Sequence, residues 1–316
     1  MTSSQSVLLT GATGFVGSAI LNKLESDTVS LLGRNKPVNF IGSYFQCEIA
    51  GDVDYHICLK GIDVVIHSAA RVHVMSEHSY DPLGEYRKIN TTGSLNLARQ
   101  AAKAGVKRFI FISSIKVNGE STIVGDKFTI QDQLKPEDPY GISKAEAEMG
   151  LLNIAKETGM EVVVIRPPLI YGPGVKGNFL NLLKIAKSGL PLPLGAIYNA
   201  RSMVYIENLT SLIILCINHR EAANRVFLAS DGEDLSTTRL LEIIRRSMNK
   251  PVWLFPVPAF IYSMLGRVTG KTAILARLTG SLQVDSSDSK KYLEWEPPYT
   301  VEEGLMVTVD SYLKNL

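Results

Sequence analysis

Residues 10–17 read Thr-Gly-Ala-Thr-Gly-Phe-Val-Gly, closing a short apolar run at 7–10 and opening a helical pattern. In such a turn one glycine permits the tight bend, one lets a phosphate approach the backbone, and one lets the helix pack closely on the strand. The free N–H groups at the start of the helix favour a bound pyrophosphate. The strand, turn and helix context therefore predicts a dinucleotide site rather than a simple tight turn. The residues expected to line it are Gly11, Thr13, Gly14, Phe15, Val16 and Gly17.

Strand-like and helix-like patterns alternate along the chain that follows this turn. A second β-like run, residues 28–32, completes a βαβ unit with the first strand and helix. Runs typical of buried strands follow at 62–66, 108–112 and 161–165, and long segments typical of helices lie at 82–104 and 139–158. The alternation predicts an α/β fold, a Rossmann-like, doubly wound parallel sheet covered by helices on both faces.

The pattern changes after Arg166, where prolines and glycines crowd residues 167–195 around one helical segment at 178–188. Strand-like runs at 203–206 and 226–229 could return to the sheet, and residues from about 231 onward are typical of a smaller helical region. We therefore expect a dinucleotide-binding Rossmann domain and a smaller, discontinuous substrate-binding lid domain. Their expected bounds are 1–166 with about 197–230 for the first, and about 167–196 with 231–316 for the second.

The composition of the 316 residues excludes several classes of protein. With 45% hydrophobic and 20% charged residues, the chain is neither disordered, collagenous nor a coiled coil. Lys and Arg number 33 against 31 Asp and Glu, so no electrostatic footprint for nucleic acid stands out and a small partner is expected. The three cysteines, Cys47, Cys58 and Cys216, form no CxxC pair and no cluster with histidine, which predicts neither a metal site nor a disulfide framework.

Neither the N-terminal residues nor the most apolar segment of the chain suggests export or a membrane span. Residues 1–6 carry no basic charge, and Gly11 and Gly14 break the apolar run that follows, so no signal peptide is indicated and a cytoplasmic location is expected. Residues 252–265 are strongly apolar but too short to cross a bilayer, and they contain Pro256 and Pro258. A buried or lid helix is favoured there over peripheral membrane contact.

Two residues bear on the type of dinucleotide. Proteins that prefer NAD usually carry Asp or Glu at the end of the second strand, whereas here Gly33 is followed by Arg34. A guanidinium suits a 2′-phosphate or stacks on adenine, so NADP as well as NAD is expected to bind, unless Arg34 is an ordinary solvated charge. Asp52 could accept a hydrogen bond from the adenine amino group, or it could cap a helix over 54–59.

Tyr140 and Lys144 lie four residues apart, on one face of the helix expected at 139–158. A tyrosine phenol has a pKa near 10, and a nearby lysine together with the positive nicotinamide would favour the phenolate, a usable acid or base. Ser113-Ser114 ends a predicted strand, at the carboxyl edge where doubly wound sheets keep their sites.

With these pieces the chain resembles the extended short-chain dehydrogenase/reductase family, in its nucleotide-sugar branch of UDP-glucose 4-epimerases and UDP-4-keto-sugar reductases. The resemblance covers nearly the whole chain. Besides residues 10–17, the matching pieces are Gly51-Asp52, His67-Ser68-Ala69-Ala70, Asn90 within 89–93, Ser113-Ser114, residues 140–144, Arg166-Pro167 and Gly172-Pro173-Gly174.

The resemblance implies a catalytic group of four residues. Ser114 would be the catalytic serine, Tyr140 the acid/base, and Lys144 the residue that binds the nicotinamide ribose and lowers the tyrosine pKa. Asn90 would support this network from its helix. Ala69 and Ala70 would contact the cofactor, as would Tyr140 and Lys144.

The resemblance also implies contacts to a nucleotide-sugar substrate. Arg201 would grip the diphosphate, for which planar bidentate donors are suited. Asn178 matches an asparagine that contacts the nucleotide, although it could instead cap its helix. Arg277 is the nearest candidate for a second diphosphate arginine. Lys116 could reach a sugar carboxylate or phosphate, or simply point to solvent.

These features predict an NAD(P)-dependent oxidoreductase acting at C4 of a UDP-linked hexose or N-acetylhexosamine. Arg34, together with Leu169 where many 4-epimerases carry asparagine, favours a 4-ketoreductase for polysaccharide precursors. A UDP-glucose or UDP-N-acetylglucosamine 4-epimerase is the alternative, and a non-catalytic dinucleotide sensor is a further one. Family likeness suggests a homodimer through the helices at 82–104 and 139–158.

Overall fold

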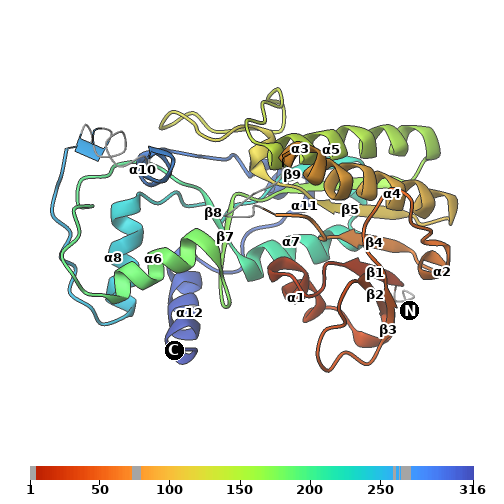
Figure 1. Cartoon of the computed structure of the whole chain (residues 1–316), viewed down its shortest axis with the longest axis horizontal. Coiled ribbons are helices and arrows are strands. Elements are labelled where there is room, and N and C mark those ends of the chain that lie inside the picture. Colours follow the sequence, from red (N-terminus) through yellow and green to blue (C-terminus); the bar gives the residue numbers. More distant parts are fainter. Residues whose placement is uncertain (1–4, 73–79, 259–260, 263, 265–271) are drawn as a thin grey trace.

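A seven-stranded parallel sheet forms the centre of the molecule (Figure 1). The computed structural model describes residues 5–72, 80–258, 261–262, 264 and 272–316. In sheet order the strands are β3 (Ser43–Gln46), β2 (Val29–Gly33), β1 (Val7–Thr10), β4 (Val64–His67), β5 (Arg108–Ile112), β6 (Glu161–Arg166) and β9 (Arg225–Leu228). The strand order reverses between β1 and β4, and a doubly wound sheet binds its ligands at such a switch point. The predicted Rossmann-like fold is confirmed.

Both faces of the sheet are covered, because alternate side chains of each buried strand point to opposite sides. On one face Leu9 and Ile66 pack with α1 (Phe15–Leu21) and α7 (Ile206–Asn218). On the other face Leu8 and Val65 pack with α4 (Ser94–Lys103) and α5 (Pro139–Thr158). The short elements that complete this half are η1 (Ser26–Thr28), α2 (His56–Leu59), η3 (Ile115–Val117) and η4 (Arg220–Ala222).

The long helix expected at 82–104 consists of three segments. The helix α3 (Pro82–Tyr86) and α4 are joined by a π-helical stretch, η2 (Arg87–Gly93). A π-helical insertion is uncommon and often marks a functional site. Here it contains Asn90, one of the predicted site residues.

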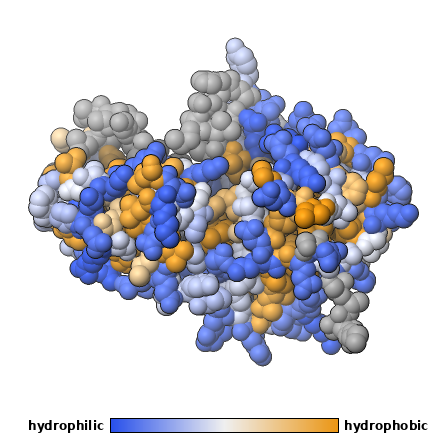
Figure 2. Space-filling model, turned by 90° about the horizontal axis from the view of Figure 1, so that it is seen from below, coloured by the Kyte–Doolittle hydropathy of each residue, from blue (hydrophilic) through white to orange (hydrophobic). Residues whose placement is uncertain are grey.

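A second group of elements builds a separate core beyond the sheet. The strands β7 (Leu169–Tyr171) and β8 (Met203–Tyr205) pair with each other in a parallel two-stranded sheet. They pack with α6 (Gly177–Lys187), α8 (Thr237–Ser247) and α12 (Val301–Lys314). Two further helices in the described part of this lobe are α10 (Thr272–Thr279) and α11 (Ser287–Leu293). This lobe lies to the left of the sheet, and its surface mixes apolar and polar areas (Figures 1 and 2).

Two expectations need correction. Of the runs at 203–206 and 226–229, only the second joins the main sheet as β9, because β8 pairs with β7 instead. The apolar segment at 252–265 is not one helix, since Leu254 in its first part forms a β-bridge with Leu192. Part of that segment lies outside the described residues. Within the described chain no helix is long and apolar enough to cross a membrane.

We expect Gly17→Ala to lower the free energy of unfolding by about 1–3 kcal/mol, as overpacking does. A Cβ at Gly17 would lie 2.1 Å from the carbonyl oxygen of Gly11, and backbone cannot move aside cheaply. Urea denaturation measures the change. The matched control is Gly33→Ala, where a Cβ meets nothing within 4 Å. Equal stability of the two variants would remove this contact as a constraint on the turn.

Candidate functional site

The glycine turn between β1 and α1 has the shape that a pyrophosphate needs. Gly11 has φ +74°, and a Cβ there would lie 2.7 Å from the backbone nitrogen of Ala69. Gly14 donates its N–H to the carbonyl of Gly11 at 2.8 Å. A Cβ at Gly14 would meet only that carbonyl oxygen, at 3.2 Å, so the space beside it is open. No side chain caps α1, so its first N–H groups are available to an anion. The turn therefore fits a dinucleotide.

A buried polar chain joins β1 to β4 at the switch point. The Nδ1 atom of His67 hydrogen-bonds with the Thr10 hydroxyl, and its Nε2 atom with the Ser94 hydroxyl, both at 2.8 Å. Burial, and to a lesser extent the charge of Lys144, lowers the pKa of His67 to about 3, so the imidazole is neutral. The Thr10 hydroxyl also accepts from the Ala69 N–H at 3.2 Å. This chain fixes the start of the Ala69-Ala70 segment.

Ser114 and Tyr140 come together at the carboxyl edge of the sheet. Ser114 follows β5 and Tyr140 is the second residue of α5, whose first turn is capped by the Asp138 carboxylate accepting from the Gly141 N–H. The Ser114 side chain is near enough to the Tyr140 hydroxyl to lower the pKa of the phenol. The serine and tyrosine singled out from the sequence are therefore in contact.

Lys144 lies one turn further along α5 and is almost completely buried. Its Nζ donates to the carbonyl of Ile112, the last residue of β5, at 2.8 Å. The ammonium also sits 4.3 Å from the centre of the Phe111 ring. Burial lowers the pKa of Lys144 to about 7, although Glu148 opposes the shift. A lysine with this pKa changes charge near neutral pH.

The pKa of Tyr140 is raised, whereas the sequence predicted a lowered one. Burial is the main cause, Asp138 and Tyr86 add to it, and only the Ser114 side chain acts in the opposite direction. The phenol is therefore protonated at neutral pH and is placed as a proton donor. Positive charge brought against the ring is what would turn it into a base.

Asn90 is fully buried and holds two neighbouring segments. Its Oδ1 accepts from the Arg71 N–H at 2.8 Å, and its Nδ2 donates to the Arg71 carbonyl at 3.0 Å. Nδ2 also donates to the Ser143 hydroxyl at 3.0 Å, next to Lys144 in α5. Asn90 thus connects η2, the segment after β4 and the helix that carries Tyr140.

Lys116 is a partly exposed lysine that pairs with two carboxylates. Its Nζ forms an ion pair with Glu120 at 2.7 Å and a second one with Asp138. Burial, which would lower the pKa of Lys116, is outweighed by these two carboxylates, so the pKa is raised. Because Asp138 caps α5, the ion pair connects the Ser114 turn to the start of the Tyr140 helix.

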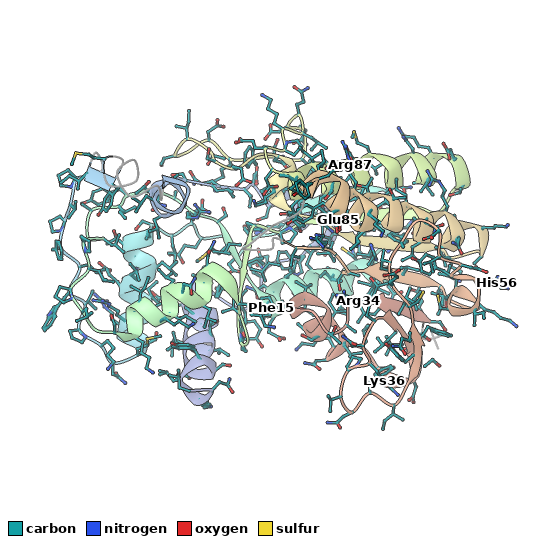
Figure 3. The ribbon with its side chains drawn as sticks, in the orientation of Figure 1. Phe15, Arg34, Lys36, His56, Glu85 and Arg87 are labelled. Atoms are coloured by element: carbon teal, nitrogen blue, oxygen red, sulfur yellow. The ribbon has the colours of Figure 1, made fainter. Side chains whose placement is uncertain are left out.

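Two of the residues predicted to contact the cofactor, Arg34 and Asp52, lie at exposed positions. Arg34 directly follows the end of β2 and is labelled in Figure 3. Asp52 is exposed, and the cap position of α2 is Tyr55, while the Asp54 carboxylate accepts from the His56 N–H at 2.9 Å. The capping alternative for Asp52 is therefore not observed.

The residues proposed for the substrate belong to the other lobe. Asn178 is exposed and is the second residue of α6, whose cap position is Lys176, so Asn178 is not the cap. Arg201 forms β-bridges with Leu235 and Leu282, and its Nη1 donates to the Gly280 carbonyl at 3.1 Å. Arg277 belongs to α10, but its side chain lies outside the described part.

Sequence reasoning missed a buried carboxylate, Asp231, that follows β9. It accepts from the Tyr171 hydroxyl at 2.7 Å, from the Tyr205 N–H at 2.8 Å and from the Asn208 amide at 2.8 Å. These bonds tie both strands of the small sheet to the end of the large one. The partners are too distant in sequence for any local pattern to reveal them.

Comparison with known proteins agrees with this geometry. A model of the NAD dependent epimerase/dehydratase family matches residues 7–229. The chain is 48% identical to UDP-glucose 4-epimerase of Vibrio cholerae, over 98% of this chain and 96% of that protein. It is 31% identical to N-acetyl-alpha-D-glucosaminyl-diphospho-ditrans,octacis-undecaprenol 4-epimerase of Escherichia coli O157:H7, over 96% and 93% of the two chains. The structure of UDP-glucose 4-epimerase from Thermotoga maritima with UDP-glucose has a TM-score of 0.77 at 24% identity, over 98% and 99% of the two chains.

We expect Lys144→Met to stabilise the protein more at pH 6 than at pH 9. Below pH 7 the lysine is charged in both states, so the folded state carries the full cost of burying it. As the pH rises from about 7 toward the ordinary value of 10.5, the folded form is neutral and this cost falls. Calorimetry should show a gain in Tm of roughly 2–4 °C for each kcal/mol relieved.

The matched control for this experiment is Lys156→Met, which removes an exposed charge from the last turn of the same helix. It should change Tm little at either pH. A gain from Lys144→Met that is the same at pH 6 and pH 9 would show that Lys144 has an ordinary pKa.

Proposed function

Since this chain belongs to the NAD dependent epimerase/dehydratase family, within the extended short-chain dehydrogenases/reductases, and is an enzyme, we propose that it interconverts C4 epimers of a UDP-linked hexose or N-acetylhexosamine. The observation that carries the proposal is the meeting of Ser114 and Tyr140, with Lys144 one turn away, at the carboxyl edge of the sheet. The chain is 48% identical to a UDP-glucose 4-epimerase along nearly its whole length, which supports a UDP-hexose as the substrate and epimerisation at C4 as the reaction.

Tyr140 acts as the acid/base at the sugar in this proposal. It removes the proton of the C4 hydroxyl as that carbon becomes a ketone, and it returns the proton when the alcohol re-forms. Ser114, which lies beside the Tyr140 hydroxyl, holds the same sugar oxygen from a second side. The nicotinamide cofactor, when bound, accepts the hydride of C4 and gives it back.

Lys144 supplies positive charge beneath this pair. A dinucleotide brings two phosphates to the site, and negative charge favours the ammonium form of a lysine whose pKa is about 7. Asn90 and Lys116 are positioning residues, because each bonds to α5 or to its cap.

The glycine turn holds the pyrophosphate and Arg34 lies where the adenosine ribose would end. From Gly33 to Cys47 the sequence contains no Asp or Glu to bind a 2′-hydroxyl. The cofactor is therefore NAD or NADP, consistent with a family that is NAD dependent.

Arg201 and Asn178 are our candidates for the UDP part of the substrate, which would lie between the sheet and the lid domain. We further expect a homodimer through α3, α4 and α5, since Met149 on α5 is half exposed. We also expect a cytoplasmic location.

A 4-ketoreductase remains the alternative reaction, supported by Arg34 and by Leu169 at the start of β7. A second candidate substrate is a hexosamine carried on a polyprenyl diphosphate. The printed name of the Escherichia coli relative supports it, and so does the absence of any Asp or Glu from residues 162–206.

The reaction is decided by adding UDP-glucose, UDP-N-acetylglucosamine or undecaprenyl-diphospho-N-acetylglucosamine to the purified protein with catalytic NAD. We expect each accepted sugar to reach equilibrium with its galacto epimer, without net consumption of cofactor. Stoichiometric oxidation of NADPH by a UDP-4-keto-6-deoxyhexosamine, with no epimer formed from the other substrates, would establish the reductase instead.

Tyr140→Phe should lower kcat by about 10²–10⁴-fold, the usual share of a general acid/base, while leaving NAD affinity nearly unchanged. Single-turnover absorbance of the reduced nicotinamide and fluorescence titration of NAD measure the two effects. Tyr312→Phe, in α12 of the other lobe, is the matched control. Near-normal turnover by Tyr140→Phe would exclude Tyr140 as the acid/base.

A further inference from the structure

The near-zero net charge hides a strong separation of charge along the chain. Residues 162–206 and 243–284 contain no Asp or Glu, but they contain 5 and 6 Lys or Arg. The rest of the chain carries 22 basic and 31 acidic residues. Both segments are therefore basic, whereas the other parts of the smaller lobe, residues 231–242 and 285–316, contain 11 Asp or Glu. An anionic surface is the natural complement of the two basic segments.

Two extended stretches of this lobe, residues 188–195 and 250–256, lie side by side and form what we call the docking ribbon. Leu192 donates its N–H to the carbonyl of Trp253 at 2.9 Å, and Phe255 donates to the carbonyl of Leu192 at 3.0 Å. Figure 1 places the ribbon at the end of the molecule opposite the seven-stranded sheet.

The ribbon is apolar on both faces, although only one of them is covered. Leu192, Leu194 and Leu254 pack on the core of the small sheet, α6, α8 and α12. Side chains alternate along extended chain, so the neighbours of Leu254 point outward. Trp253 is 59% exposed and Phe255 47%, and Leu190 at the start of the ribbon is 64% exposed.

A buried arginine holds the ribbon in this shape. The guanidinium of Arg245, on α8, is fully buried and donates to the carbonyls of Leu190, Pro251 and Trp253. Three bonds from one side chain fix both stretches. The aromatic side chains are therefore presented by a rigid platform rather than by a loose loop.

Exposed cations flank the apolar side chains. Lys184 and Lys187 lie in the last turn of α6, and Arg246 and Lys250 lie at the end of α8 and just beyond it. None of the four forms an ion pair with a carboxylate in the part of the chain that the structure describes. The view from below shows apolar and polar surface interspersed on this lobe (Figure 2).

We propose that the docking ribbon binds the surface of an anionic lipid bilayer. Trp253 and Phe255 enter the headgroup region, where amphipathic aromatic rings are favoured, and the flanking lysines meet lipid phosphates. A second copy docked ribbon to ribbon fits poorly, because it would set the flanking cations of one copy against those of the other. The sequence had favoured a buried or lid helix for residues 252–265, and the exposed aromatic residues of the ribbon favour the membrane contact instead.

The test is cosedimentation of the full chain with vesicles of phosphatidylcholine and phosphatidylglycerol in equal parts. We expect binding that falls as salt is added and is weak on pure phosphatidylcholine. Trp253→Ser/Phe255→Ser should lower the partition coefficient by about tenfold or more, and Lys187→Gln/Lys250→Gln by about tenfold at low salt. Lys36→Gln/Ile41→Ser, a matched pair of exposed residues beside β2 and β3, should bind like the wild type.

Tryptophan fluorescence gives a second readout. The chain has two tryptophans, and Trp295 is buried with its Nε1 donating to the Ser211 hydroxyl at 2.9 Å. A blue shift on adding the anionic vesicles should therefore come from Trp253 and be absent in Trp253→Ser.

Three results would overturn the proposal: no sedimentation with anionic vesicles, unchanged sedimentation of both double variants, or ribbon substitutions that dissociate an oligomer in ultracentrifugation. Turnover of a UDP-sugar in solution should be the same in the ribbon variants as in the wild type. Failure of the membrane proposal is thus distinguishable from failure of the proposed reaction.

Discussion

The buried ion pair between Arg166 and Glu148 fixes how α5 lies on the sheet. The Nη2 atom of Arg166 is 2.6 Å from the Glu148 carboxylate, and both side chains are almost completely excluded from solvent. Arg166 ends β6 and also donates to the side chain of Asn118. Breaking a buried pair on one side costs several kcal/mol, so the helix can rotate or slide only at large cost.

The geometry of the candidate site follows from this constraint. Residues four apart share one face of a helix, so Tyr140, Lys144 and Glu148 form one row on α5. With Glu148 held at the end of β6, Lys144 is carried to the end of β5 and Tyr140 to Ser114. The same row buries Lys144 and Tyr140, and this burial lowers the pKa of Lys144, against the effect of Glu148, and raises that of Tyr140. Burial thus produces groups that change charge or hold a proton near neutral pH, as acid/base chemistry requires.

The sequence predicted the parts of the fold whose signals are local. β1, β5 and α5 begin and end where expected, because apolar runs bounded by glycine, and a helix opened by Asp138 and Pro139, are strong patterns. β3 and β7 were missed, since one is a half-exposed edge strand and the other has only three residues. The π-helical turn at Asn90 has no sequence signal that separates it from α-helix.

In the candidate site, too, the sequence predicted the features that have a local signal and not those that depend on distant partners. The glycine turn, Ser114, Tyr140 and Lys144 could be found because each lies in a recognisable motif at the carboxyl edge. The hydrogen bonds of His67 with Thr10 and Ser94, and the role of Asp231 beside the small sheet, were not predicted because the partners lie far away in the sequence. Lys116 was assigned to the substrate or to solvent because its ion pair with Asp138 exists only after folding.

The central claim is that C4 of the sugar exchanges a hydride while Tyr140 moves only the proton of the adjacent oxygen. The most direct measurement follows deuterium placed at C4 of UDP-glucose during turnover in ordinary water. We expect the UDP-galactose formed to retain the deuterium at C4, as read by NMR. Loss of the label to solvent would contradict it, because C4 would then have exchanged a proton with an acid/base group.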